Sequence, residues 1–413
     1  MYLNKCKKIL SVVLSAVLLG SSASCVKIEM RNSDINSIEK EAETSETAPQ
    51  MLMQATRKNA VETTPVETEE ETTPVVPKET LAISICGDII VDNSIISDAA
   101  NRAGDGQSYS FLRMYTGIYS TLSSADLSLC SYKEAEDVDS PIESVGALYD
   151  LGIDAVNTGS AKDISSYLEE YNLYDINENS DSILITEGDL AIASLSLSEK
   201  DCTGDKYKSD IEYADFMSDI VIVFVDWEEN TAEKDKAAVM KKIAEAGADI
   251  IVGNGDNIGK IEWIDTGDGT LTLAAYSLGN ILSTADDAQS LYGGILNLSV
   301  EYGDGSIELS NVSLIPTVTH YVASESEEVS GYQVFTFDAY NDELAGSHAV
   351  SDITMDKLKN SVKSVVSEDF LPDYLRYIKE LKIDELQKEL FCRAGSCGNI
   401  VRSHASLRVL EKE

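Results

Sequence analysis

The sequence predicts an α/β fold, because short apolar runs alternate with segments of helical period. Residues 81–86, 219–225 and 250–252 are apolar enough to form buried strands. Between the last two, residues 232–246 have an amphipathic helical pattern that ends at Gly247, a common helix terminator. Strands that alternate with helices in this way favour a sheet covered by helices.

The remaining elements follow from the same kinds of pattern. Residues 142–151 have helical spacing and lead into a strand over 152–156. Aromatic residues on one face predict a helix over 109–122. Residues 181–196 predict two short strands around the turn Glu187-Gly188-Asp189. Further strands are expected at 125–129, 271–276, 293–300, 306–316 and 332–337.

The first 25 residues predict a lipoprotein signal peptide. Lys5, Lys7 and Lys8 precede an apolar stretch, residues 9–20, that is too short to span a bilayer. Small residues then lead to Cys25, as in a bacterial lipobox, although Ser22 stands where an apolar residue is usual. We therefore expect a lipidated Cys25 and a chain anchored to the extracytoplasmic face of the cell membrane. An ordinary secretory peptide is the alternative.

Composition divides the rest of the chain into three parts. Residues 26–79 are rich in Glu, Thr and Pro and have no hydrophobic period, which predicts a disordered, extended linker. Residues 80–345 carry the strands and helices of the α/β domain. Residues 346–413 form a helical C-terminal region, in which apolar residues recur at helical spacing.

Charge and cysteine usage narrow the possible functions. The 413 residues include 32 Lys and Arg against 72 Asp and Glu, a formal net charge of −40. Such acidity argues against nucleic-acid binding and against electrostatic docking on anionic lipid. Of the seven cysteines, Cys86 and Cys130 end strand-like runs and are interpreted as buried thiols. Cys392 and Cys397 could pair, but no disulfide framework is evident.

Polar residues directly follow several of the predicted strands. Gly87-Asp88 follows the first strand, and Asp226-Trp227 follows the strand at 219–225. The strand at 250–252 is followed by Gly253 and then by Asn254-Gly255-Asp256-Asn257. Open α/β sheets place their sites at the carboxyl ends of strands. Each signal alone is weak, because Asp is also a common cap residue and Asn-Gly-Asp-Asn is good turn chemistry without any ion.

Together with Glu262 and the run Tyr276-Ser277-Leu278-Gly279-Asn280, these segments resemble the CapA-type (PGA_cap, poly-γ-glutamate capsule synthesis) family over about residues 81–340. The resemblance implies a calcineurin-like metallophosphoesterase fold, which is a mixed β-sheet sandwich flanked by helices. It also implies a site at the strand ends in which carboxylates, histidines and an asparagine hold divalent metals.

The chain departs from the family pattern at the positions that would bind metal. A glutamate position holds Lys133, and histidine positions hold Lys162, Asp226, Asn254 and Asn257. The three histidines of the chain fall elsewhere. A protonated lysine has no lone pair to offer and repels a divalent ion. We therefore expect no metal cofactor, with Lys133 and Lys162 paired to Asp88 and Asp226. The alternative is a hard divalent cation held by oxygen ligands alone.

These observations lead to one expected function and two alternatives. We expect a membrane-anchored, extracellular CapA-like lipoprotein associated with capsule or poly-γ-glutamate biosynthesis or export, without catalysis. Its partners would be the membrane, capsule-polymer synthesis or export proteins, or the anionic polymer. The alternatives are a metal-dependent phosphoesterase-like hydrolase and a surface ligand-binding module. The expected cleft residues are Asp88, Lys133, Lys162, Asp226, Trp227, Asn254, Asp256, Asn257, Glu262 and Asn280.

Overall fold

The computed structural model describes residues 78–376, apart from 160–163, 178–182, 188–189, 205, 229, 268, 304 and 325–328. Several expectations lie outside these residues. They are the signal segment with Cys25, residues 26–77 of the linker, Lys162, residues 181–182 and 188–189 of the expected strand pair, and residues 377–413 of the C-terminal region, with Cys392 and Cys397.

One sheet, sheet A, has eight strands in the order β14-β13-β12-β1-β2-β3-β4, and β11 also pairs with β1. The pairs from β1 through β4 are parallel, whereas β12, β13 and β14 form an antiparallel run. The strands are β1 (Glu79–Val91), β2 (Leu127–Glu134), β3 (Ala155–Gly159), β4 (Tyr174–Asn177), β11 (Asn280–Leu282), β12 (Tyr292–Gly303), β13 (Ser306–Ala323) and β14 (Val329–Thr336).

The second sheet, sheet B, has six strands in the order β5-β6-β7-β8-β10-β9. Its four inner strands are parallel, and both edge strands are antiparallel to their neighbours. The strands are β5 (Ile183–Glu187), β6 (Leu190–Ser198), β7 (Ile220–Asp226), β8 (Ile250–Gly253), β9 (Ile261–Asp265) and β10 (Leu271–Ala275).

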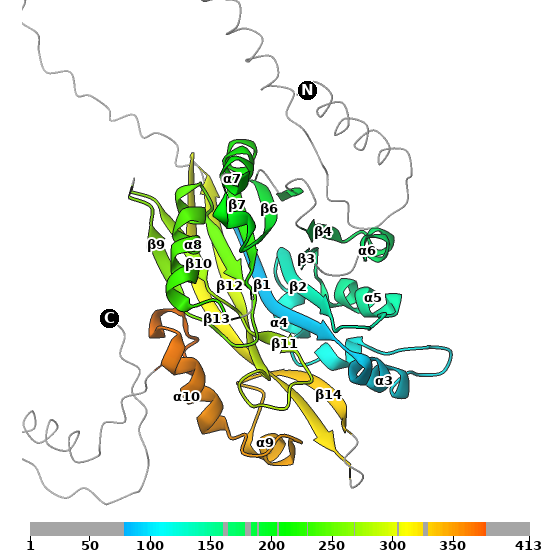
Figure 1. Ribbon diagram of the computed structural model, residues 1–413. Helices are drawn as coiled ribbons and strands as arrows, with labels where there is room; N and C mark the ends of the chain where they lie inside the picture. The colour runs from blue at the N-terminus through cyan, green and yellow to red at the C-terminus, as the bar shows by residue number, and fades with distance from the viewer. Residues whose placement is uncertain are drawn as a thin grey trace, which may run out of the picture.

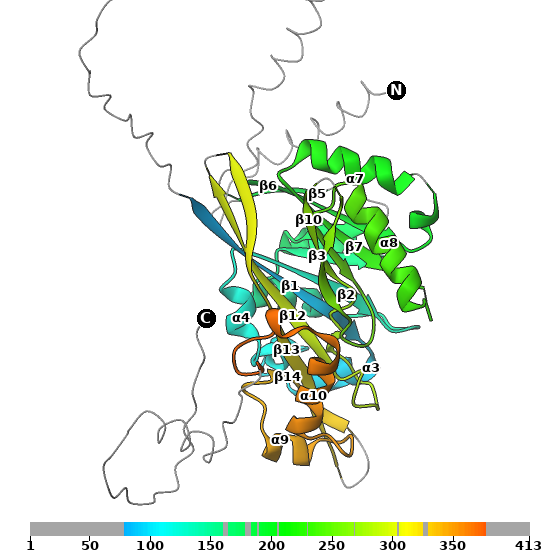
Figure 2. The ribbon, with the colours of Figure 1, turned by 90° about the vertical axis from the view of Figure 1, so that its left-hand side faces the viewer.

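The side chains of β7 point alternately to the two faces of sheet B, and both faces are buried. Ile222 and Phe224 join the large core that also contains Ile85 and Leu129 of sheet A. Val221 and Val223 instead join a second core with residues of α7 (Lys206–Met217) and α8 (Glu233–Glu245). These two helices cover the outer face of sheet B in Figures 1 and 2.

The other helices are short and surround sheet A (Figure 1). Buried residues of α3, α5, α6 and α10 belong to the same large core. The described helices beyond α7 and α8 are α3 (Asn93–Asn101), α4 (Tyr119–Ser123), α5 (Ile142–Leu151), α6 (Ser165–Tyr171), α9 (Asp342–Ser347) and α10 (Met355–Val365), with 3-10 turns η1 (Leu112–Tyr115), η2 (Asp201–Thr203) and η3 (Glu368–Phe370). None of these helices is long and apolar enough to cross a bilayer.

The α/β prediction is confirmed, with two mixed sheets flanked by helices. The helix expected over 109–122 is wrong as a single element. The chain forms η1 and α4 instead, separated at Gly117. A side chain at Gly117 would lie 2.3 Å from the Val334 carbonyl oxygen, so the segment bends there to contact β14.

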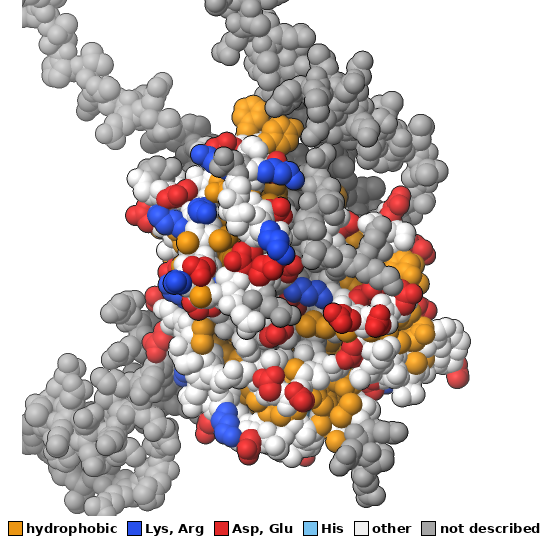
Figure 3. Space-filling model, viewed as in Figure 1, with side chains coloured by type: hydrophobic (Ala, Val, Ile, Leu, Met, Phe, Trp, Pro, Cys, Tyr) orange, Lys and Arg blue, Asp and Glu red, His pale blue; other side chains and the backbone are white. Residues whose placement is uncertain are grey.

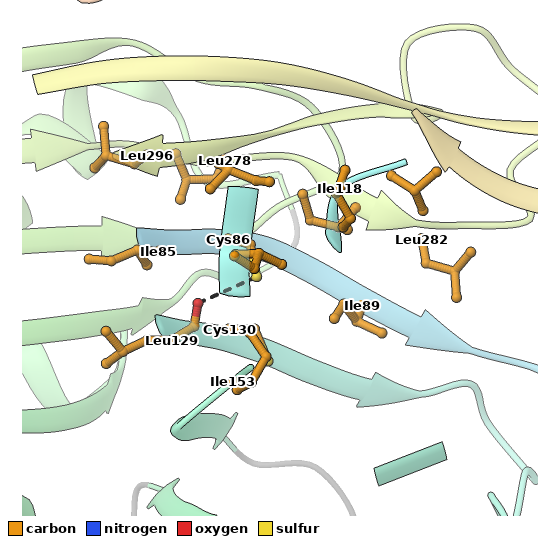
Figure 4. Close-up of a cluster of buried hydrophobic side chains, with 14 of the residues drawn as sticks. Ile85, Cys86, Ile89, Ile118, Leu129, Cys130, Ile153, Leu278, Leu282 and Leu296 are labelled. Carbon is orange, nitrogen blue, oxygen red and sulfur yellow. Dashed lines mark hydrogen bonds between the residues drawn. The ribbon is translucent and has the colours of Figure 1, made fainter. Parts of the chain in front are cut away.

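Cys86 and Cys130 are free and buried, as expected, but they lie within β1 and β2 and do not end these strands. Cys86 and Cys130 are partners in the parallel pairing of β1 and β2. The Cys86 thiol donates a hydrogen bond to the Leu129 carbonyl oxygen at 3.4 Å, within the apolar cluster drawn in Figure 4.

Candidate functional site

Asp88 lies late in β1 and is only 2 % exposed. Its position depends on the preceding glycine, because a side chain at Gly87 would lie 2.1 Å from the Gly279 carbonyl oxygen. The same carbonyl accepts a 2.9 Å hydrogen bond from the Asp88 backbone N–H. The Gly-Asp pair and the Ser-Leu-Gly-Asn turn, distant in sequence, are therefore in direct contact.

Lys133 lies near the end of β2 and brings a positive charge to Asp88. Its Nζ is 2.9 Å from Asp88 Oδ2 and 3.8 Å from Asp226 Oδ1. The Lys133 side chain is 34 % exposed and that of Asp88 only 3 %. A further, longer contact to Asp88 Oδ2 comes from the Gly255 backbone N–H at 3.4 Å. The ammonium thus lies between two carboxylates at the edge of the core, and the predicted pairing of Lys133 with Asp88 is present.

The electrostatics of this pair have two opposed contributions. Burial raises the pKa of Asp88 above its ordinary value, while the Lys133 charge and hydrogen bond act to lower it. Burial also acts to lower the pKa of Lys133, but the charges of Asp88 and Asp226 outweigh it, and that pKa is raised. The burial effect alone would favour a neutral Asp88. The 2.9 Å contact and the raised lysine pKa instead support a charged pair.

Asp226 and Asn254 are joined at the ends of β7 and β8. The Asn254 amide nitrogen donates to Asp226 Oδ1, and its amide oxygen accepts the Trp227 backbone N–H at 3.0 Å. Both ends of the Asn254 amide are therefore bound within the protein, which fixes the amide orientation. The Trp227 indole N–H donates to the Tyr276 carbonyl oxygen at 2.9 Å and so joins the end of β7 to the end of β10.

Glu262 belongs to a separate group of side chains. Its carboxylate accepts a 2.8 Å hydrogen bond from the Tyr276 hydroxyl and a second one from Lys260. Burial acts to raise the pKa of Glu262, but these two partners outweigh it, and the pKa is lowered. The described contacts give Glu262 no bond to Asp88, Lys133 or Asp226.

The other predicted cleft residues have different environments. Asp256 and Asn257 are exposed on the loop after β8, and the Asp256 charge helps to raise the pKa of Lys133. Asn280 is 1 % exposed, and it is the register partner of Asp88 across β1 and β11. Its amide nitrogen donates to the Ser290 carbonyl oxygen at 3.1 Å. Its amide oxygen is buried and has no hydrogen-bond partner among the described residues.

Several residues that were not among the expected cleft residues also shape the site. Asn157, in the middle of β3, donates to the Ser131 hydroxyl at 3.0 Å and supports β2 just before Lys133. The Ser277 hydroxyl donates to the Gly255 carbonyl oxygen and accepts the Gly279 N–H, both at 3.0 Å. Ser131 lies within β2 and Ser277 lies after β10, but each directly follows an apolar run in the sequence, and that shared position is the signal that could have identified them.

These side chains do not fit the two-metal centre that the family resemblance implies. Asp88 and Asp226 share an ammonium, and the Asn254 amide is held by Asp226 and Trp227. No three His, Cys, Asp or Glu side chains of the described residues gather as a metal-binding group. Of the histidines, His320 and His348 lie together with Tyr340 in another part of the core, and His404 is outside the described residues.

Part of the chain matches a known protein family. Residues 159–285 match the family model described as bacterial capsule synthesis protein PGA_cap. The resemblance to the PGA_cap family is confirmed. The matched PGA_cap segment contains Asp226, Asn254, Glu262 and Asn280, whereas Asp88 and Lys133 lie before it.

Two solved structures are similar to this chain at 13 % sequence identity each. A hypothetical protein from Thermus thermophilus covers 57 % of this chain and 99 % of its own, with a TM-score of 0.37. Vps29 of Chaetomium thermophilum covers 62 % of this chain and 98 % of its own, with a TM-score of 0.23. TM-scores this low do not support any inference about function. No curated protein sequence matches the chain.

Proposed function

We propose that this chain is a membrane-anchored, extracytoplasmic lipoprotein that takes part in capsule or poly-γ-glutamate synthesis or export without catalysing a reaction. The PGA_cap match over residues 159–285 supports the link to capsule synthesis. The signal-like first 25 residues support export and a lipid anchor at Cys25. The observation that carries the non-catalytic part is the Lys133 ammonium between Asp88 and Asp226.

The chemistry of hydrolysis explains why that ammonium matters. Metal-dependent phosphoesterases activate water by placing it on divalent ions, which lower its pKa. A protonated lysine 2.9 Å from the buried carboxylate opposes a divalent ion at the same place by charge repulsion. Lysine also offers no lone pair while it is charged. A role in binding or positioning a partner requires neither a bound divalent ion nor an activated water.

The proposal is tested in a capsule-forming strain from which the gene for this chain has been deleted. We expect less surface polymer after deletion, and recovery with the wild-type chain. The variant that combines Asp88→Asn with Lys133→Met, which removes both charges at similar volume, should also restore the polymer, because no step of catalysis depends on the pair. Unchanged polymer after deletion would contradict the capsule role. Failure of the folded double variant would contradict the non-catalytic role.

The anchor is tested separately with Cys25→Ala. We expect this variant to leave the membrane fraction or to remain unprocessed, since the acyl chains would have no attachment point. A matched Cys202→Ala variant, which changes a buried thiol of the folded domain, should stay in the membrane fraction. Equal fractionation of the wild-type and Cys25→Ala chains would contradict lipid anchoring at this residue.

A further inference from the structure

Asp88 is the carboxylate whose burial most needs explanation. Its side chain is 3 % exposed, and an unpaired charge buried to that extent is strongly unfavourable. Its charged partner in the described contacts is Lys133, which also approaches Asp226. Removing one partner of such a pair leaves an uncompensated charge in the protein interior. The folded state therefore depends on a cation at the position of Lys133 Nζ.

The oxygens around that position are those that hard divalent cations prefer. Asp88 and Asp226 supply two carboxylates. Asn280 is the parallel register partner of Asp88, so the two side chains leave the sheet on the same face. The hydrogen bond from its amide nitrogen to Ser290 fixes the amide orientation, and its buried amide oxygen has no partner among the described residues. A buried oxygen without a partner can accept a water or a cation, so Asn280 is the candidate third ligand on this face of the sheet.

We infer that Lys133 is the resident cation of this site, and that removing its ammonium converts the same oxygens into a divalent-cation site. The inference goes beyond the capsule role, because it concerns how the carboxylates are neutralised and holds whatever the chain does in the cell. Oxygen ligands favour calcium or magnesium over zinc. Solvent can reach the position, since the Lys133 and Asp226 side chains are 34 % and 28 % exposed.

The experiment compares the full chain with Lys133→Ala and with Lys260→Ala as a matched control. Lys260 also pairs with a carboxylate, Glu262, but outside this site. Tm is measured in EDTA and in about 10 mM calcium, a concentration above the roughly millimolar Kd expected for so few ligands. We expect Lys133→Ala to lose about 5 °C in EDTA and to recover about 3 °C with calcium. Calcium should raise the Tm of the wild-type and Lys260→Ala chains by equal amounts, and by less than it raises the Tm of Lys133→Ala.

A second variant separates the counterion role from the cation site. Asp88→Asn combined with Lys133→Ala removes the buried charge, so it should be more stable in EDTA than Lys133→Ala alone and should lose the extra calcium response. A calcium titration of Lys133→Ala by calorimetry should give binding that this double variant lacks. If Lys133→Ala keeps the wild-type Tm in EDTA and gains no calcium response, the inference is overturned. If Lys133→Ala fails to fold even with calcium while the double variant folds, the counterion role stands and the cation site is overturned.

Discussion

The backbone at Gly253 lies very close to Trp227 and Tyr276, which follow β7 and β10. A side chain here would lie 2.3 Å from both the Trp227 indole nitrogen and the Tyr276 carbonyl oxygen. Those two atoms are joined by the hydrogen bond that connects the ends of β7 and β10. Only a residue without a Cβ fits at this position without moving the backbone or the tryptophan ring.

Gly253→Ala should therefore destabilise the fold by about 2–4 kcal/mol, through overpacking and loss of the indole hydrogen bond. The free energy of unfolding in urea measures the effect. Gly204→Ala is the control, because a Cβ at Gly204 meets no atom within 4 Å and should change stability by less than about 0.5 kcal/mol. Equal stability of the two variants would mean that the tryptophan contact contributes little.

The histidines of the core lie away from the cleft and are held neutral. The His348 ring donates to the Thr319 carbonyl oxygen at 3.0 Å and accepts the Val350 N–H at 2.9 Å. Protonation would set a second ring N–H against that backbone donor. Burial lowers the pKa of His348, and it lowers that of the neighbouring His320 from 6.5 to about 4.

A pKa that is lower in the folded state means that acid favours the unfolded chain. The stability contributed by His320 is complete above about pH 6.5 and is lost as the pH falls toward about 4, by up to about 1.4 kcal/mol per pH unit. Asp249 acts in the opposite direction, because burial raises its pKa to about 6, so its own contribution improves on acidification. His320→Phe should make the decline in unfolding free energy between these pH values shallower than in wild type. Identical slopes would contradict a neutral, buried His320.

At the scale of elements, Asp98 joins α3 to the edge strand β14. Its side chain, 4 % exposed, accepts the backbone N–H groups of Gly331 and Tyr332 at 2.9 and 3.0 Å. Arg102, one turn further along α3, adds an ion pair at 3.0 Å. One carboxylate thus satisfies two backbone donors of a strand that is far away in the sequence.

Asp98→Ala should cost about 3 kcal/mol or more, because it leaves two backbone donors and a partly buried guanidinium without this acceptor. Chemical denaturation measures the loss. Asp105→Ala, which changes an exposed carboxylate in the loop after α3, should remain within about 0.5 kcal/mol of wild type. A similarly small effect at Asp98 would show that β14 is held mainly by apolar packing.

The strands could be predicted from the sequence because their burial leaves an apolar pattern. The run at 219–225 corresponds to β7, and the run at 250–252 falls within β8. The helix expected over 109–122 failed because Gly117 bends the chain for a contact with β14, and local spacing does not report tertiary contacts. Residues 206–217, which form α7, carry a weaker apolar pattern and were not predicted.

As with the fold, some features of the candidate site could be predicted from the sequence and others could not. The family resemblance placed Asp88 and Lys133 among the ligand positions and so suggested their pairing, which the structure contains. Both residues lie within β1 and β2, which continue beyond the ends predicted from the apolar runs. The hydrogen bond between Asn254 and Asp226 was not foreseen, because it depends on the exact register of β7 and β8. Glu262 was expected in the cleft but is held by Tyr276 and Lys260, which the sequence alone could not rank as partners.

At the scale of the whole molecule, the site requires both sheets. Asp88 and Lys133 come from sheet A, whereas Asp226 and Asn254 come from the ends of sheet B strands. The PGA_cap segment, residues 159–285, therefore holds Asp226 and Asn254 of sheet B and Asn280 of β11, but neither Asp88 nor Lys133. The surface is interspersed with acidic and basic side chains on the face shown in Figure 3, and the full chain carries a net charge of −40. A long anionic polymer would be repelled by such a chain unless cations screen the charge.

We propose that this site is neutralised from within by Lys133 and needs no metal. The most direct test measures the metal content of the purified full chain together with hydrolysis of a phosphodiester in the presence of added Mn²⁺, Zn²⁺ or Mg²⁺. We expect transition metal far below one ion per chain, and hydrolysis no faster than that of Asp88→Ala under the same conditions. Near-stoichiometric transition metal, with hydrolysis that Asp88→Ala abolishes, would contradict the proposal.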